Sequence, residues 1–549
     1  MAPEKNEDGM SRSSTASWMD AVEMAAALAL TAFLAGLQVL FFLRGGGLFQ
    51  DEVATVNIAQ LPSVLDVWEH LQFDSMPLVW PYVLRAWAAL GFTSDLALRF
   101  PGLVLGLLVL AALWILAPQF GCRTPLIALA FVELNFEGTR TVGYIKQYGL
   151  GILLNLGFLA SVWSCVKSPS RWRWWLALLV GMLGAHTLYH NCFFILATLA
   201  AGMAVTLSER AWKRTLGLLA MGLTILVSMT IYTATLTTVA DWSPTVELPA
   251  HYRTWSNFFQ GLLRSLSPTG TFWLWFWAAA AVFCVLCWAS RRRGEETAPA
   301  TKDRPRIVFL LAAILAAVVY LGFFAVSRQP YNSRYFIVLF AYVAVPAEAL
   351  LLIRVNAFAI MRLLRLAMVA YLCWAYAGPV WRDIARGESQ MVRVVELIEA
   401  NADNGDLIVI SPWAEGMIFA RYFHGPNPWF TIPPLEDNRM HRSDLIKKCM
   451  QEDDPTAAAR AKIAEALQDK RRVFFVVGNA MISQQATIPV RPGKPPLPLT
   501  EWNETVYLLY WHAGTQTLLL RHSVEQEFLC RASGEYRSPV GLICFQGWK

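Results

Sequence analysis

Long apolar runs recur over the first two thirds of the chain and constrain its fold more than any other feature. A helix needs roughly 20 apolar residues to cross the hydrocarbon of a bilayer, and eleven segments approach this length. These segments are Met19–Leu43, Leu96–Leu116, Pro125–Val142, Gly149–Val166, Trp174–Tyr189, Cys192–Leu207, Leu216–Leu236, Phe272–Ser290, Ile307–Val326, Tyr335–Ile353 and Met361–Gly378. We therefore predict an α-helical polytopic membrane protein with about 11 transmembrane helices.

The composition and the placement of charge agree with this prediction. Of the 549 residues only 16% are charged, whereas soluble proteins carry about 25%. The net charge of +6 does not indicate nucleic-acid binding, because the basic residues lie in short clusters between apolar runs. Cytoplasmic loops are rich in Lys and Arg. A cytoplasmic N-terminus places the clusters around Arg171, Lys213, Arg291 and Arg362 on one side and the C-terminal part on the other.

Three parts follow from this pattern. Residues 1–18 form a cytoplasmic tail, residues 19–378 a membrane domain with an outer loop at 44–95, and residues 379–549 an α/β soluble domain on the outer face. "GDLIVISP" and "RRVFFVVGN" predict strands, "PTAAARAKIAEALQDK" predicts a helix, and "ETVYLLYW" with "TQTLLLRH" predicts a late hairpin. Cys530 and Cys544 are candidates for a disulfide in an oxidising compartment, but the sequence does not give the distance between them.

The motifs that suggest chemistry fall on the predicted outer face. They offer carboxylates, cations, hydroxyls and an imidazole, carried by Asp51, Glu52, Asp74, Lys146, Tyr148, Tyr189, His190, Arg334 and Tyr335. Walker loops, GxSxG elbows, HExxH helices and Gly-rich dinucleotide turns are absent from the sequence. The set suits displacement at a sugar anomeric carbon whose leaving group is a lipid phosphate, because a carboxylate can take the acceptor proton and cations can stabilise the departing charge.

These motifs resemble those of a known superfamily. "DE" after the first span, then "PLVWPYVLRAW", "LRFPG", "YIKQYGLG", "LYHNCFFIL" and "SRYFIVLF" are similar in order and side to the GT-C superfamily of polyprenyl-phosphate-dependent glycosyltransferases. The likeness is greatest to bacterial relatives of the protein O-mannosyltransferases, including the lipid A aminoarabinose transferases and the rhizobial galacturonosyltransferases. The chain departs from the family pattern in carrying Pro77 alone, in having Lys146 where an arginine is common, and in lacking a WWDYG signature.

The resemblance implies a GT-C fold, an inverting reaction and a set of roles. Asp51 is the expected base, with Glu52 and Asp74 as further catalytic candidates. The donor phosphate is assigned to Lys146, Tyr148, Arg334 and Tyr335, and substrate binding to Tyr189 and His190. The implied partners are a polyprenyl-phosphate-linked sugar donor of the undecaprenyl type, a glycan, lipid or protein acceptor and membrane lipids, without nucleic acid. The implied location is the inner membrane of a bacterium. Whether the reaction requires a divalent cation, Mg²⁺ or Mn²⁺, held by Asp51 and Glu52 is not determined by the resemblance.

Each residue also has a structural interpretation. Asp51 and Glu52 are compatible with helix capping, and Asp74 with a turn before Met76 and Pro77. Lys146 and Arg334 are compatible with charged anchors at helix ends, and His190 with a packed imidazole.

Two other functions remain open at this point. A transporter or flippase of a lipid-linked or anionic substrate should carry polar residues or broken helices near the middle of its spans. A structural subunit of an envelope complex would tolerate loss of the acidic pair.

Overall fold

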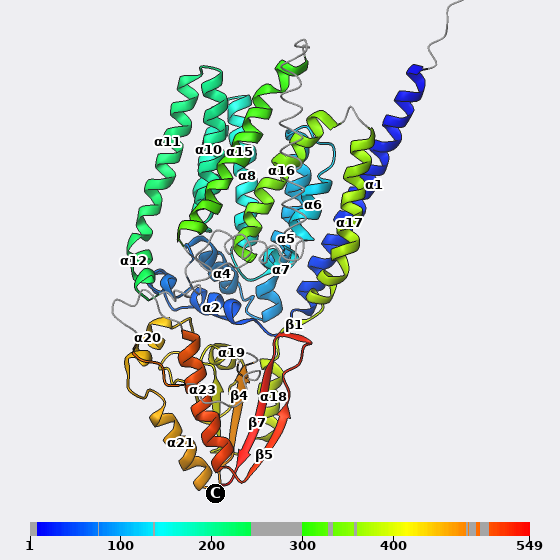
Figure 1. Ribbon diagram of the computed structural model, residues 1–549. Helices are drawn as coiled ribbons and strands as arrows, with labels where there is room; N and C mark the ends of the chain where they lie inside the picture. Colours follow the sequence, from blue (N-terminus) through cyan, green and yellow to red (C-terminus); the bar gives the residue numbers. More distant parts are fainter. Residues whose placement is uncertain are drawn as a thin grey trace, which may run out of the picture. The chain divides into compact units, whose positions relative to one another are not determined.

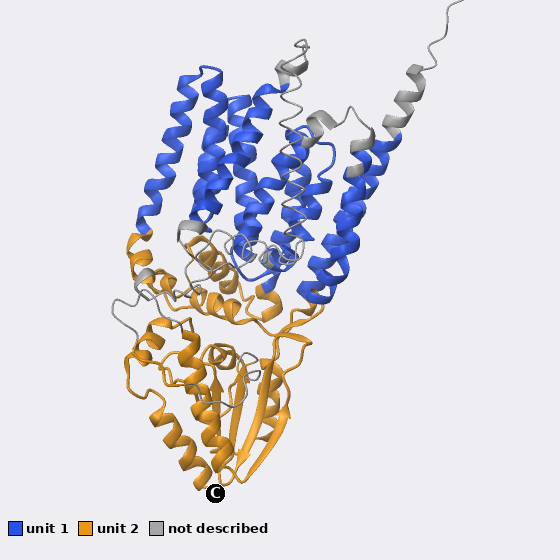
Figure 2. Cartoon of the chain, viewed as in Figure 1, with its two compact units in different colours: residues 1–42, 99–231, 251–383 blue, residues 43–98, 232–250, 384–549 orange. Residues whose placement is uncertain are grey.

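The computed structural model describes residues 8–74, 76–134, 138–242, 299–327, 333–355, 359–478, 481, 490–494 and 504–549. The chain divides into two compact units, each assembled from segments that are separate in the sequence (Figure 1, Figure 2). Unit 1 comprises residues 1–42, 99–231 and 251–383, and unit 2 comprises residues 43–98, 232–250 and 384–549. The loop predicted at 44–95 therefore belongs to the same unit as the C-terminal part.

Unit 1 is a helix bundle, drawn in blue in Figure 2. Its elements are α1 (Asp8–Arg44), α5 (Asp95–Gln119), α6 (Leu126–Glu133), α7 (Gly138–Gly143), α8 (Tyr148–Lys167), α9 (Arg171–Ala185), α10 (Asn191–Ser208), α11 (Trp212–Ser228), the 3-10 turn η2 (Met229–Tyr232), α15 (Pro299–Ser327), the 3-10 turn η4 (Ser333–Phe336), α16 (Ile337–Val355) and α17 (Ala359–Ile384). The first residues of α5 and the ends of α1, η2 and α17 already belong to unit 2.

Six helical stretches in the described residues are long and apolar enough to cross a membrane. They are Trp18–Arg44, Asp95–Gln119, Tyr148–Lys167, Asn191–Ser208, Trp212–Val239 and Asp303–Phe323. All six coincide with predicted spans, which makes the chain a multi-pass helical protein. Helices α9, α16 and α17 occupy three further predicted spans, and Phe272–Ser290 lies outside the described residues. The full number of crossings stays a prediction.

The predicted span Pro125–Val142 is wrong as a single helix. The chain forms α6 and the separate α7 instead. Glu133 ends α6: its buried carboxylate accepts a hydrogen bond from Gln38 at 2.9 Å, and its carbonyl accepts one from the Thr139 hydroxyl at 3.1 Å. A Cβ on Gly138 would lie 2.2 Å from the Val132 carbonyl oxygen, so only glycine permits this close return of the chain. A buried carboxylate with side-chain partners therefore interrupts the apolar run.

Buried ion pairs tie α1, α16 and α17 together inside unit 1. Arg362 donates to both carboxylate oxygens of Glu23, and one of these contacts is a 2.7 Å ion pair. Arg365 lies 3.7 Å from Glu23 and 3.9 Å from Glu348. All four side chains are buried. Arg362 and Arg365 are therefore structural partners of buried acids.

Unit 2, drawn in orange in Figure 2, combines short helices with a sheet. Its elements are α2 (Gln50–Ala59), α3 (Val64–His70), the 3-10 turn η1 (Leu71–Phe73), α4 (Val79–Ala89), α12 (Thr233–Trp242), β1 (Gly387–Ser389), α18 (Met391–Asn401), β2 (Leu407–Ser411), α19 (Glu415–Tyr422), β3 (Trp429–Thr431), α20 (Ser443–Gln451), α21 (Ala457–Gln468), β4 (Val473–Gly478), α23 (Glu504–His522), β5 (Glu525–Cys530), β6 (Tyr536–Ser538) and β7 (Val540–Gln546).

The main sheet has the order β3-β2-β4-β7-β5. Strand β2 runs parallel to β3 and β4, whereas β7 runs antiparallel to β4 and β5. Every residue of β2 and β4 is buried. Central strands that are covered on both faces read as continuous apolar runs, which is why "LIVIS" and "VFFVVG" predict them correctly. The C-terminal part is therefore α/β, as expected.

One expectation for the C-terminal part is wrong, and the open question of a disulfide between Cys530 and Cys544 is answered. Residues 504–522 form the single helix α23 and not a hairpin, because Tyr507, Trp511, Thr515 and Leu519 repeat every four residues and are buried on one face. Cys530 and Cys544 are free thiols. Cys530 pairs across the sheet with Leu542, while Cys544 pairs with Glu527, so the sheet register keeps the two sulfurs apart.

The first segment of unit 2 is fastened to its last segment. Gly47 forms an antiparallel bridge with Ser389. The backbone N–H of Leu48 donates to the Tyr422 hydroxyl at 2.6 Å, and this hydroxyl donates to the Asp95 carboxylate at 2.6 Å. Burial and the neighbouring Asp95 charge raise the pKa of Tyr422, so the phenol keeps its proton and remains a donor.

Two glycines of the "GGG" stretch make this connection possible. Gly46 has a φ of +62°, a conformation that side chains with a Cβ rarely adopt. A Cβ on Gly47 would lie 2.6 Å from Cγ2 of Val392 in α18. The glycines after α1 therefore allow the chain to turn and pack closely against the C-terminal segment.

Candidate active site

Asp51 lies in the first turn of α2, in the segment that follows the membrane-length helix α1. Its side chain is 19% exposed, and its Oδ1 is 3.4 Å from Nε2 of His441. His441 comes from the C-terminal segment, between β3 and α20. A partly exposed carboxylate beside an imidazole has the components needed to accept a proton and pass it on.

Asp74 lies in the same region and is linked to Asp51 through Thr55. The Thr55 hydroxyl is 2.6 Å from Oδ2 of Asp74 and 2.9 Å from the backbone carbonyl of Asp51. Thr55 follows Asp51 by four residues, which places both on one face of α2. The structure therefore brings together two of the three predicted acids, with a hydroxyl between them.

Glu52 has a different environment. It is fully buried, and its Oε2 accepts a 3.0 Å hydrogen bond from the backbone N–H of Phe49. The first N–H groups of a helix lack partners within the helix. Glu52 therefore caps the start of α2, and this contact holds the adjacent Asp51 at the helix N-terminus.

The loop that carries His441 is stiffened by charged contacts. Arg439 and Arg442 both contact the carboxylate of Asp437, at 3.0 and 3.1 Å. Burial raises the pKa of Asp437, but the hydrogen bonds from the two arginines outweigh it and hold the pKa below its usual value. The side-chain amide of Asn57 in α2 donates to the Arg439 carbonyl at 2.8 Å. The guanidinium of Arg442 lies 4.9 Å from the ring centroid of Phe73.

Sequence reasoning missed His441 and its loop. The signal that was available is the stretch "EDNRMHRSD", residues 436–444, which gathers three acids, two arginines and a histidine after a short strand. Loops at the carboxyl ends of parallel strands are common positions for functional groups. The sequence alone does not say that this loop contacts α2.

Two further acids lie near the carboxyl ends of β2 and β4. The indole N–H of Trp413 donates to Oε1 of Glu504 at 2.7 Å. Burial raises the pKa of Glu504, while this hydrogen bond and the charge of His441 act in the opposite direction. Burial also raises the pKa of Glu415 to about 7, and its Oε2 has no hydrogen-bond partner among the described residues. Unit 2 thus holds protonatable carboxyls in addition to the predicted ones.

In unit 1 the predicted residues His190, Arg334 and Tyr335 lie together. The His190 ring centroid is 5.4 Å from that of Tyr335 and 5.6 Å from that of Tyr320. The Tyr320 hydroxyl donates to the Tyr335 carbonyl at 2.8 Å, and the Arg334 guanidinium lies 5.5 Å from the Tyr335 ring centroid. Burial lowers the pKa of His190 to about 4, so its imidazole is neutral at physiological pH.

A buried asparagine fixes this end of the bundle. Asn191, which follows Tyr189 and His190, accepts from Asn155 at 2.7 Å and donates to the Gly151 carbonyl at 3.3 Å. Gly151 lies one turn after Tyr148 at the start of α8. These contacts hold Tyr189 and His190, which precede α10, at the end of α8 where Tyr148 lies.

Lys146 lies between α7 and α8 and is only 6% exposed. Tyr148, two residues later, is also 6% exposed. A charged anchor at a helix end would extend its ammonium group into water, whereas the side chain of Lys146 is buried. An ammonium group in such a position is suited to a buried anion.

The described residues contain no group of three His, Cys, Asp or Glu side chains that could hold a metal ion. The Glu52 carboxylate accepts a backbone N–H, and Asp51 faces His441. These two acids would therefore supply few ligands on their own, and a bound Mg²⁺ or Mn²⁺ would complete its coordination from water or substrate oxygens.

No protein-family model and no curated protein matches this sequence. Among solved structures, the chain is similar to ArnT from Cupriavidus metallidurans bound to undecaprenyl phosphate, with 12% identity over 86% of this chain and 96% of that chain and a TM-score of 0.44. The apo state of that protein gives 13% identity over 83% and 94%, with a TM-score of 0.47.

The archaeal oligosaccharyltransferase from Archaeoglobus fulgidus, in its apo form, gives 12% identity over 83% of this chain and 70% of that chain, with a TM-score of 0.47. The likeness to these structures leaves the GT-C superfamily a resemblance of the sequence motifs, because every TM-score is below 0.5. At these identities and scores it assigns no donor, acceptor or residue, and the roles of individual side chains depend on their contacts in this chain.

Proposed function

We propose that this chain is a membrane glycosyltransferase that moves a single sugar from a polyprenyl phosphate to a hydroxyl of an envelope glycan, lipid or protein. The observation that carries the proposal is the Asp51 carboxylate, which follows a membrane-length helix and faces His441. The Thr55 hydroxyl, which contacts the backbone carbonyl of Asp51, is also within hydrogen-bond distance of the Asp74 carboxylate. The donor is an undecaprenyl-type lipid, and the reaction takes place at the outer face of a bacterial inner membrane.

The proposed reaction is one inverting displacement. The acceptor oxygen forms a bond to the anomeric carbon as the bond from that carbon to the phosphate oxygen breaks. The acceptor proton passes to the Asp51 carboxylate, and the polyprenyl phosphate leaves with its bonding electron pair. A positioned base contributes about 10²–10⁴-fold to such a step. His441 takes the proton from Asp51 and returns the carboxylate to its charged form.

The cations of unit 1 are assigned to the donor phosphate. Lys146 is buried, and Arg334 lies against the ring of Tyr335. Positive groups placed where charge develops stabilise the transition state. Tyr148 and Tyr335 offer hydroxyls to the phosphate, and Tyr189 and the neutral His190 offer hydrogen bonds to the sugar.

The test of Asp51 uses purified full-length protein in detergent with polyprenyl-phosphate sugars. Asp51→Asn should reduce release of polyprenyl phosphate by about 10²-fold or more and leave donor binding intact. A matched control is Asp66→Asn, which removes another acid of the same loop, one that caps α3 through Ser63. Transfer by Asp51→Asn at more than about a tenth of the wild-type rate would remove Asp51 from the role of base.

The reaction itself is tested in cells and in micelles. Mass spectrometry of cells without the gene should find one accumulated monosaccharide phospholipid and one missing glycan residue. Release of polyprenyl phosphate in detergent, where no membrane separates two compartments, distinguishes a transferase from a transporter. A protein that moves the lipid-linked sugar without cleaving it would contradict the proposal.

The donor assignment has its own test. Lys146→Ala and Arg334→Ala should each raise the apparent donor constant by about tenfold, because a charge-assisted hydrogen bond contributes about 1.5–3 kcal/mol. The acceptor constant should change little. Lys213→Ala, which removes an exposed cation of α11, is the control. Unchanged donor constants in both variants would exclude these residues from the donor site.

A further inference from the structure

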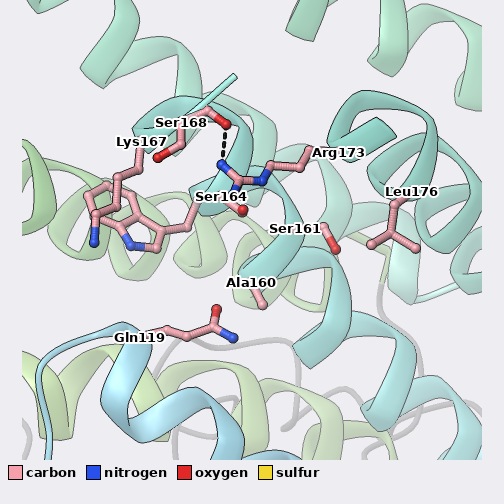
Figure 3. Close-up of a pocket in the computed structure, with 9 residues that line it drawn as sticks. Gln119, Ala160, Ser161, Ser164, Lys167, Ser168, Arg173 and Leu176 are labelled. Carbon is pink, nitrogen blue, oxygen red and sulfur yellow. Dashed lines mark hydrogen bonds between the residues drawn. The ribbon is translucent and has the colours of Figure 1, made fainter. Parts of the chain in front are cut away.

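A pocket lies in unit 1 at the end of α8 that is far from Tyr148. Its volume is about 360 Å³, and it is formed by the end of α5, the last turns of α8 and the start of α9 (Figure 3). Helix α8 spans Tyr148–Lys167, so its rise of 1.5 Å per residue separates the two ends by roughly 30 Å. The pocket is therefore distinct from the cluster of His190 and Tyr335.

The polar groups that line this pocket suit an anion. Lys167 and Arg173 supply two cations, and none of the described residues that line the pocket is acidic. Ser161, Ser164 and Ser168 add hydroxyls at helical spacing along one face of α8 and its C-terminal end. Figure 3 shows Arg173 reaching back to Ser168, where its guanidinium donates to the backbone carbonyl.

The charge of Lys167 is available to a ligand. Lys167 is exposed, and no ion pair joins it to an acid in the part of the chain that the structure describes. The pocket also contains the start of α9, whose first N–H groups carry partial positive charge, and Ser170 caps this helix. The indole N–H of the buried Trp163, another lining residue, has no hydrogen-bond partner among the described residues.

The surroundings of the pocket favour a lipid over a soluble anion. Leu176 lines the pocket and is 38% exposed. Trp172, Trp175 and Leu179 lie on the same face of α9 at spacings of three and four residues, and they are 73%, 66% and 56% exposed. Aromatic side chains of this kind concentrate at the boundary between headgroups and acyl chains. An apolar surface suited to acyl chains thus continues from a cationic, hydroxyl-rich pocket.

We propose that this pocket binds the phosphodiester headgroup of an anionic phospholipid. Lys167 and Arg173 bind the phosphate oxygens, the serine hydroxyls bind the polar headgroup, and the exposed face of α9 contacts the acyl chains. Basic pockets between transmembrane helices are known to select anionic lipids in this way. The site is independent of the glycosyl transfer proposed above, so its test does not measure transfer.

The test uses full-length protein in nanodiscs made from an equal mixture of phosphatidylcholine and phosphatidylglycerol, followed by native mass spectrometry of retained lipids. The wild type should retain phosphatidylglycerol in preference to phosphatidylcholine. Lys167→Ala should reduce this preference by about tenfold, because it removes one charge-assisted contact. Lys167→Glu should abolish it. Lys167 is exposed, so both variants are expected to fold.

Controls separate the pocket from general surface charge. Lys213→Ala with Arg304→Ala removes two exposed cations outside the pocket and should keep the preference. Lys167→Arg keeps the charge and should also keep it. The proposal is overturned if Lys167→Glu retains the wild-type preference, or if the control pair loses as much as Lys167→Ala. It is also overturned if glycerol phosphate or inorganic phosphate displaces the retained lipid at equal concentration, since the pocket would then select a soluble anion.

Discussion

At the scale of single residues, the contact between Asp51 and His441 links two segments that lie far apart in the chain. The distance of 3.4 Å between their side chains is at the outer limit of a hydrogen bond. Catalytic hydrogen bonds are often long in the absence of substrate and tighten when it binds. In the proposed reaction His441 acts through Asp51, and it is therefore a positioning residue that also removes the proton.

His441→Gln tests this role. We expect turnover to fall roughly tenfold, less than for Asp51→Asn, because the base itself remains. The pH–rate profile should also change shape, since the imidazole beside the base is lost. His424→Gln, which removes an exposed histidine of the same unit, should leave both rate and profile unchanged. A profile identical to that of the wild type would reduce His441 to a packing role.

Glu415 makes the stability of the C-terminal part depend on pH. Burial raises the pKa of its carboxyl from 4.5 to about 7. The folded state therefore binds the proton more tightly than the unfolded state does. The resulting stability is present below pH 4.5 and is lost as the pH rises through 7, by at most about 3 kcal/mol.

Glu415→Gln is neutral at every pH and should remove this dependence. Its unfolding temperature should match that of the wild type near pH 4.5 and exceed it by about 5 °C at pH 8. Scanning fluorimetry across this range measures the difference. Glu465→Gln in α21, where the side chain is 68% exposed, is the control and should show no trend with pH. A constant difference between Glu415→Gln and the wild type would mean that the carboxyl does not titrate in this range.

At the scale of elements, the sequence predicted those helices and strands whose formation depends only on residues close to one another in the chain. The acid beyond α1, the buried strands β2 and β4 and helix α21 could be predicted because each depends on neighbouring residues. The division of Pro125–Val142 could not, because it depends on Gln38 from another helix. The hairpin predicted over residues 504–522 failed because β-prone residues repeat at a helical period, and burial on one face decides between the two.

The same limit applies to the candidate site. Asp51, Asp74, His190, Arg334 and Tyr335 were predicted from loop polarity and motif order, and their roles stay proposals. The capping role of Glu52 depends on local geometry, and the sequence predicted it only as one of several alternatives. His441, Glu415 and Glu504 come from a part of the chain where the sequence carries no catalytic motif, and only the fold places the first of them beside Asp51.

The buried ion pairs of α1, α16 and α17 give a prediction at the scale of elements. Glu23→Gln leaves Arg362 and Arg365 without their shared carboxylate, and breaking a buried pair costs about 3–5 kcal/mol. Asp20→Asn is the matched control, because Asp20 also contacts Arg362 but is 30% exposed, and such pairs contribute about 1 kcal/mol or less.

The measurement for these variants is the temperature at which purified protein loses its monodisperse peak. Glu23→Gln should fall well below the wild type, and Asp20→Asn should stay close to it. Equal losses in the two variants would mean that the buried network does not stabilise the bundle.

At the scale of the whole molecule, the topology is still a prediction. The basic residues at 209–214 between α10 and α11 are expected on the cytoplasmic side, and residues after Asn404 on the outer side. Reporter fusions at Glu209 and Asn404 should therefore respond oppositely, with the cytoplasmic reporter active at Glu209 only. Reporters that agree at the two positions would mean that the number of crossings between them is even.

Unit 2 is built from three segments that are separated in the sequence, and this affects how the unit folds during synthesis. Its first segment emerges from the ribosome roughly 300 residues before the last one, an interval on the order of 15–60 s at about 5–20 residues per second. During that interval Gly47 lacks its bridge partner Ser389, and Asp51 in α2 lacks the neighbouring His441. A nascent chain therefore lacks the contact between Asp51 and His441, so the proposed activity requires the last segment of unit 2 to have folded.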